Sequence, residues 1–144
     1  MNTDRVTTKG LELLGNYKRQ FGKHSLDANV TYAYTKSQDD ATGKQLIYVP
    51  YHKATGSVSY AYNRFSAYVQ GLYNDEVFTR TDNNSRYNLD AYVTANAGAS
   101  YSYGSKVNYT LGVQVLNLAN YDYASVDSRP MPGRNYMMNL TLKF

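Results

Sequence analysis

Most of this sequence alternates apolar and polar residues with a period of two. The end of the chain shows the pattern most clearly, because Tyr136, Met138, Leu140, Leu142 and Phe144 all fall on one side of the alternation. Period two is the side-chain period of a β-strand, in which successive residues point to opposite faces of the sheet. About ten residues is also the length of a strand that crosses a bilayer.

The same alternation recurs in seven stretches, and helical spacing fits none of them well. It predicts an all-β fold, an antiparallel sheet with one apolar and one polar face. In the first stretch we assign Leu11 and Leu13 to the apolar face and Lys9 to the polar face. The predicted strands are residues 6–18, 25–35, 53–62, 65–74, 88–103, 106–116 and 136–144.

The connections between these strands alternate between short and long. Residues 19–24, 63–64 and 104–105 form short turns, whereas residues 36–52, 75–87 and 117–134 form long loops. Outer-membrane barrels have short turns on their periplasmic side and long loops on their extracellular side. Soluble β-sandwiches also contain hairpins, but strict alternation over three successive pairs is less expected of them.

Aromatic residues are placed in the way that a lipid-facing surface requires. The chain has 17 Tyr, 4 Phe and no Trp, and the Tyr ring with its hydroxyl suits the boundary between water and lipid. Aliphatic residues fill the middle of the apolar face between two aromatic groups, as in a transmembrane barrel. The group near the short turns is Tyr60, Tyr62, Phe65, Tyr101, Tyr103 and Phe144, and the group near the long loops is Tyr32, Tyr34, Tyr73 and Tyr136.

Several function classes find no support in the sequence. The net charge is +4, but the 15 Lys and Arg are scattered, so we expect no nucleic-acid partner. Cysteine is absent, which removes disulfides and thiolate metal sites. No nucleophile elbow, metalloprotease pair or P-loop occurs, so we expect neither an enzyme, nor a cofactor, nor a metal site.

The direction of the chain leads to an expectation about its completeness. If the short turns are periplasmic, the last strand runs toward the periplasm and the first strand begins outside. A bacterial single-chain barrel has an even number of strands, with both ends normally in the periplasm. We therefore expect residues 1–144 to be the C-terminal portion of a larger barrel.

Three segments resemble TonB-dependent receptors: residues 8–13 (TKGLEL), residues 49–53 (VPYHK), and Asn117-Leu-Ala-Asn120 with residues 129–136 (RPMPGRNY). The resemblance implies a 22-stranded barrel that is plugged by an N-terminal domain and lies in the outer membrane of a Gram-negative bacterium. Such receptors import scarce nutrients, such as ferric siderophores or cobalamin, with energy passed by TonB. The chain would then be the last seven strands, with the plug and the earlier strands absent.

The resemblance also implies partners. Outer-membrane lipid would surround the apolar face, and the remaining strands and the plug would complete the receptor. TonB would be reached only through the missing plug. The terminal strand resembles the signal that outer-membrane barrels present to the barrel-assembly machinery, and its residues would be Tyr136, Leu140, Leu142 and Phe144.

Ligand contacts, if the chain makes any, belong to the long loops. Aromatic and planar cationic side chains bind conjugated or anionic ligands, although polar loop residues can equally be there because water surrounds them. The candidates are Tyr48, Arg80, Arg86, Tyr121, Asp122, Tyr123, Asp127 and Arg129. We expect Pro130, Pro132 and Gly133 to shape the last loop, with Pro fixing φ and Gly allowing a positive φ.

Two other interpretations remain open at this point. The chain could be a small membrane barrel that is completed by self-association and acts as a porin, an adhesin or a structural protein. It could also be a soluble, ligand-binding β-barrel of lipocalin-like shape, which would fold without detergent.

Overall fold

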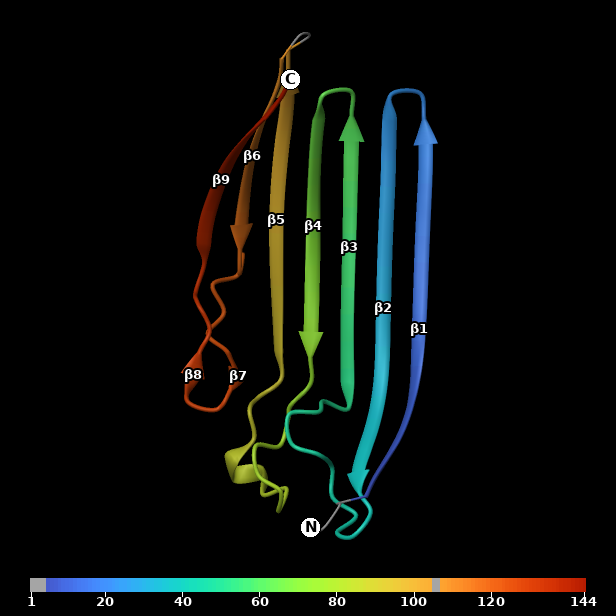
Figure 1. Cartoon of the computed structure of the whole chain (residues 1–144), viewed down its shortest axis with the longest axis vertical. Helices are drawn as coiled ribbons and strands as arrows, with labels where there is room; N and C mark the ends of the chain where they lie inside the picture. Colours follow the sequence, from blue (N-terminus) through green and yellow to red (C-terminus); the bar gives the residue numbers. More distant parts are fainter. Residues whose placement is uncertain (1–4, 105–106) are drawn as a thin grey trace.

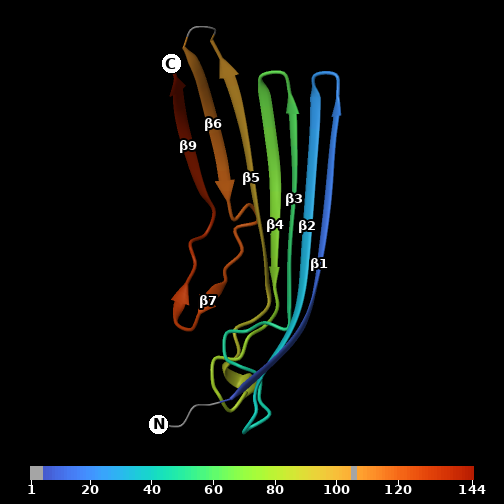
Figure 2. The ribbon, with the colours of Figure 1, turned by 45° about the vertical axis from the view of Figure 1, so that its right-hand side comes forward.

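The computed structural model describes residues 5–104 and 107–144. Seven strands form one antiparallel sheet in the order β1-β2-β3-β4-β5-β6-β9, and a second sheet contains only β7 and β8. Turned by 45°, the large sheet is seen as a single curved layer (Figure 2). The strands are β1 (Val6–Phe21), β2 (His24–Asp39), β3 (His52–Tyr62), β4 (Phe65–Asn74), β5 (Tyr92–Tyr103), β6 (Asn108–Leu116), β7 (Ala124–Val126), β8 (Arg129–Pro130) and β9 (Asn135–Lys143).

The seven predicted strands are confirmed, with differences at their ends. β4 has the predicted bounds, whereas β1 and β2 each extend to 16 residues and β5 begins only at Tyr92. The alternation did not predict the β7–β8 hairpin or the 3₁₀ turn Ser85–Tyr87. The predicted start of the sixth strand at Lys106, and Ser105 in the preceding turn, lie outside the described residues.

Figure 1 shows that the long connections lie at one end of the sheet and the short turns at the other, where β9 also ends. Two of the short turns close tightly, since Phe21 pairs with His24 and Tyr62 pairs with Phe65. Gly22 takes a φ of 61° in the first of these turns, a left-handed conformation that costs glycine little. The chain therefore reverses within two residues at that end.

The strand register confirms that one face of the sheet is apolar. Residues that are directly opposite share a face, and one such row runs Ala28, Val58, Val69, Ala97 and Val115 from β2 to β6. The assignment of Lys9 to the polar face is wrong. Lys9 is opposite Lys36 and lies in the same alternate set as Leu11, so it is on the apolar face near the long connections.

Aromatic rings gather at both ends of the apolar face. Near the short turns, Phe21 stacks on His24 at 5.0 Å between ring centroids, and the His24 ring is 4.5 Å from that of Tyr62. Near the long connections, the rings of Tyr34 and His52 are 5.3 Å apart. The predicted groups include Tyr62 and Tyr34 but neither Phe21 nor the two histidines.

The apolar face is not covered by any other part of the described chain. Val77 is the sole hydrophobic residue among the described ones that is buried, while Met138 is 75% exposed and Leu140 63% exposed. A water-soluble sheet would bury such a face against a second layer. The lipocalin-like interpretation is therefore not favoured. Among the described residues, no helix is long and apolar enough to span a membrane.

The opposite face is held together by hydrogen bonds between polar side chains on neighbouring strands. Thr31 and Thr55 are joined at 2.5 Å between hydroxyl oxygens, and Ser66 and Ser100 at 2.7 Å. The Tyr68 hydroxyl donates to Gln114 Oε1 at 3.0 Å, across the backbone of β5. Such hydrogen bonds connect β2 with β3, and β4 with β5 and β6, although Leu14 breaks the alternation and is 72% exposed on this face.

Candidate functional site

The first two long connections, residues 40–51 and 75–91, are joined by a pair of reciprocal hydrogen bonds. The Gln45 backbone N–H donates to Asn83 Oδ1 at 2.8 Å, and Asn83 Nδ2 donates to the Gln45 carbonyl at 2.9 Å. Gln45 is only 3% exposed, and its Oε1 accepts from the Ser37 N–H at 2.9 Å. The two connections therefore form one hydrogen-bonded unit at the end of the sheet that carries the long connections.

The third connection, residues 117–134, is organised by the side chain of Asn117. This residue is 4% exposed and has a φ of 51°. Its Nδ2 donates to the carbonyls of Tyr121 at 2.8 Å and Pro132 at 3.3 Å, and its Oδ1 accepts from the Tyr121 N–H at 2.9 Å. One amide thus joins the beginning of the connection to its end.

Asn120 and Gly133 complete this arrangement and correct one prediction. The Arg134 N–H donates to Asn120 Oδ1 at 2.7 Å. Gly133 does not have the positive φ that we expected of it; Gly22, Gly43 and Gly104 are the described glycines that do. A Cβ on Gly133 would lie 2.9 Å from Asn120 Oδ1, so the close approach of Asn120 explains the glycine.

A hollow of about 460 Å³, which we call the loop hollow, lies between the second and third connections. It brings together four of the predicted ligand-contact residues, Tyr121, Asp122, Tyr123 and Arg129. The rings of Tyr123 and Tyr92 face each other at 4.5 Å between centroids. The hollow therefore combines aromatic surface with charges of both signs.

Two residues of the loop hollow, Asp90 and Tyr92, were not among the candidates. The sequence predicts a fifth strand from residue 88, which makes both of them strand residues. β5 in fact begins at Tyr92, and Asp90 belongs to the connection before it. No sequence signal marks them, because Leu89 continues the alternation of β5 and its pairing with Val77 inside the connection is visible only in the structure.

The other four candidates lie outside the loop hollow. Tyr48 lines a smaller hollow of about 170 Å³ together with Asp90 and Tyr92. The Arg80 guanidinium lies 3.5 Å from the centroid of the Tyr87 ring, a cation–π contact within its own connection. Arg86, in the 3₁₀ turn, and Asp127, between β7 and β8, are both exposed.

A second hollow of about 590 Å³, the polar hollow, lies against the polar face of the sheet. Its walls include hydroxyl and amide side chains, such as Thr55, Gln70 and Asn96, beside apolar ones such as Leu72 and Leu116. Tyr123 lines both the polar hollow and the loop hollow. The loops thus present a chemically mixed surface that continues onto the polar face.

Known proteins are similar to this chain in sequence and in fold. The family described as TonB dependent receptor-like, beta-barrel matches residues 1–118. The vitamin B12 transporter BtuB of Photobacterium profundum is 27% identical over 144 residues, which is 100% of this chain and 22% of that protein.

Two solved structures have the same fold. The siderophore receptor PiuA from Acinetobacter baumannii superposes with a TM-score of 0.78 at 20% identity, over 96% of this chain and 22% of that one. The copper transporter OprC gives a TM-score of 0.69 at 17% identity, over 94% and 23%. The chain spans about a fifth of the length of these relatives, and it belongs to the family of TonB-dependent receptor-like β-barrels.

Proposed function

We propose that this chain forms part of the wall and of the extracellular vestibule of a receptor that imports a scarce nutrient across the outer membrane of a Gram-negative bacterium. The observation that carries the proposal is the loop hollow, which shares Tyr123 with the polar hollow on the inner face. Tyr123 therefore lies at the boundary of the two hollows, where a ligand that leaves the loops would meet the polar surface. The role is transport rather than catalysis.

The residues of the loop hollow suggest the class of ligand. Tyr92, Tyr121 and Tyr123 offer aromatic faces, and Arg129 offers a planar cation. Such a set suits a conjugated or anionic metal chelate, as in a ferric siderophore or cobalamin. BtuB is named as a vitamin B12 transporter, PiuA as a siderophore receptor and OprC as a copper transporter, so the relatives do not decide among these ligands.

The proposed partners follow from the same placement. Outer-membrane lipid contacts the apolar face, the plug and further barrel strands meet the polar face and the sheet edges, and the barrel-assembly machinery receives β9. TonB acts through the plug and not on this chain. An immunoblot of the outer-membrane fraction with an antibody against residues 119–134 tests whether the chain is part of a larger receptor. If it is, the antibody detects a band several times heavier than 16.3 kDa.

Uptake by whole cells tests the vestibule. We expect the double variant Tyr123→Ala/Arg129→Ala to reduce uptake of radiolabelled cobalamin or of a ferric siderophore at least tenfold. The matched control is Arg86→Ala, which removes an exposed arginine of the neighbouring connection outside the loop hollow and should leave uptake within twofold. Equal uptake by the double variant and by Arg86→Ala, for every ligand that the wild type imports, would refute the assignment.

A further inference from the structure

The charged residues of the sheet are divided unequally between its two faces. The register places Lys9, Arg19 and Lys36 on the apolar face. The acidic strand residues Glu12, Asp27 and Asp39 are all in the opposite alternate set. Within the described strands, the apolar face therefore carries cations and no carboxylate.

These cations stand at the two borders of the apolar band. About ten residues separate Lys9 from Arg19, which is about 34 Å along a strand and about 26 Å across a bilayer at a typical tilt of about 40°. The apolar band of an outer-membrane barrel is about 25 Å tall. Lys9 and Lys36 thus reach the headgroup layer near the long connections, and Arg19 reaches the layer near the short turns.

Lys9 and Lys36 are direct cross-strand partners. Their Cβ atoms are then about 5 Å apart, and like charges in this position destabilise a sheet. The described residues contain one ion pair, Arg5 with Asp40 at 3.4 Å, and neither lysine takes part in it. An anion that lies between the two ammonium groups would turn this repulsion into attraction.

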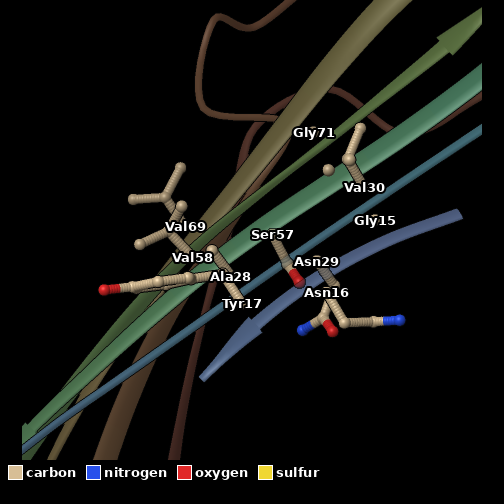
Figure 3. Close-up of a pocket in the computed structure, with 11 residues that line it drawn as sticks. Gly15, Asn16, Tyr17, Ala28, Asn29, Val30, Ser57, Val58, Val69 and Gly71 are labelled. Carbon is tan, nitrogen blue, oxygen red and sulfur yellow. The ribbon is translucent and has the colours of Figure 1, made fainter. Parts of the chain in front are cut away.

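The apolar face also has a hollow of about 620 Å³, which we call the glycine hollow. Gly15, Gly56 and Gly71 lie in one register row across β1, β3 and β4, with Val30 of β2 between the first two. Figure 3 shows Val58 and Val69 of its lining on one side of the ribbons and Asn16 and Asn29 on the other. The missing side chains leave an apolar groove about six residues, or about 20 Å along the strand, from Lys9.

We propose that the apolar face of β1–β4 binds one phosphorylated lipid of the leaflet near the long connections. Its phosphate lies between Lys9 and Lys36, and one of its acyl chains lies over Leu11 and Leu13 and fills the glycine hollow. The assignment rests on the membrane placement under the proposed function, but not on nutrient import. Charge complementarity selects the headgroup, and the groove selects a lipid over a free anion.

Native mass spectrometry of the protein, extracted from its own outer membrane in a mild detergent, tests the site. We expect the wild type to retain one lipid and to bind added diphosphoryl lipid A at least tenfold more tightly than the same lipid without phosphates. Lys9→Gln/Lys36→Gln should lose this preference. The matched control Lys53→Gln removes a cation from the polar face of β3 and should keep it.

A groove variant separates a lipid from a simple anion. A Cβ on Gly71 would have the Thr94 carbonyl oxygen at 3.8 Å as its nearest neighbour, so Gly71→Leu fits the sheet and fills the hollow. We expect it to weaken lipid A binding at least fivefold. Three results would overturn the proposal. Inorganic phosphate could displace the lipid completely, the two forms of lipid A could bind equally, or a second copy of the chain could occupy the face in place of the lipid.

The proposals for the lipid site and for the vestibule can be refuted independently. Lys9→Gln/Lys36→Gln should lose the lipid and keep nutrient uptake within twofold, whereas Tyr123→Ala/Arg129→Ala should keep the lipid. Retention of the lipid by the double lysine variant refutes the lipid site whatever the uptake assays give.

Discussion

Replacement of Asn117 should loosen the third long connection while the sheet remains intact. Its side chain makes three hydrogen bonds, to the Tyr121 N–H, the Tyr121 carbonyl and the Pro132 carbonyl. At about 1 kcal/mol net for each bond, their loss costs about 3 kcal/mol. Asn117→Gly removes only these bonds, because glycine tolerates the φ of 51°. Asn117→Ala adds about 1 kcal/mol of backbone strain.

Amide hydrogen exchange by mass spectrometry in detergent micelles measures these costs. Since about 1.4 kcal/mol corresponds to a tenfold change in an equilibrium constant, Asn117→Gly should speed exchange of the Tyr121 amide roughly 100-fold, and Asn117→Ala more. Asn117→Asp keeps the acceptor for the Tyr121 N–H but turns a buried carboxylate oxygen toward the Tyr121 and Pro132 carbonyls, so exchange should be at least as fast as in Asn117→Gly.

The matched control is Asn83→Gly, which makes the same change at a φ of 52° in the second connection. It should speed exchange in residues 40–51, which Asn83 holds through Gln45, and leave residues 118–134 unchanged. An unchanged Tyr121 amide in Asn117→Gly, or equal acceleration of β2 and β3, would show that the Asn117 amide does not organise this connection.

Three further predictions test the faces, the last loop and the terminal strand. Met138→Lys, on the apolar face, should lower the free energy of unfolding, measured in urea with lipid vesicles, by about 2–4 kcal/mol. Met137→Lys, on the polar face, should lower it by less than about 1 kcal/mol. Equal losses in the two variants would contradict the lipid-facing assignment. Gly133→Ala places a Cβ 2.9 Å from Asn120 Oδ1 and should raise protease cleavage between β6 and β9. A variant that is not cleaved would show that the Asn120 side chain can move away. Deletion of Phe144, which is 94% exposed, should reduce assembly in cells but not folding in vesicles, and parallel losses would instead assign Phe144 to stability.

The strands and their faces could be predicted because period-two alternation is a local property. The alternation does not predict the ends of the strands where they extend beyond the apolar band. Residues 36–39 carry no apolar alternation, yet β2 continues through them, since Ser37 is hydrogen-bonded to Gln45 and Thr8. The prediction for Lys9 is wrong because its charge suggests the polar face, whereas its position in the alternation places it with Leu11.

The site was less predictable because it depends on contacts between loops. Tyr92 and Tyr123 are far apart in sequence and meet only when β5 and β6 are paired and the third connection folds back. Residue type gave Tyr121, Tyr123 and Arg129 as candidates, but it could not separate them from Arg80, whose guanidinium is already engaged by Tyr87. The Asn117 segment belongs to the family resemblance in the sequence, and the structure shows that the Asn117 side chain joins the two ends of the third connection.

The proposed function and the proposed lipid site both depend on how the two edges of the sheet are paired. β1 and β9 are its outermost strands, and in an antiparallel strand alternate residues direct both backbone groups away from their partner, about eight residues in β1. In lipid each unpaired group costs several kcal/mol, so these edges outweigh any side-chain term discussed above. Under the proposed function, these edges pair with other strands, of the same barrel or of a second copy, before the apolar face meets lipid. The loop hollow and the lipid site therefore have to be measured in the native assembly, where those edges are closed.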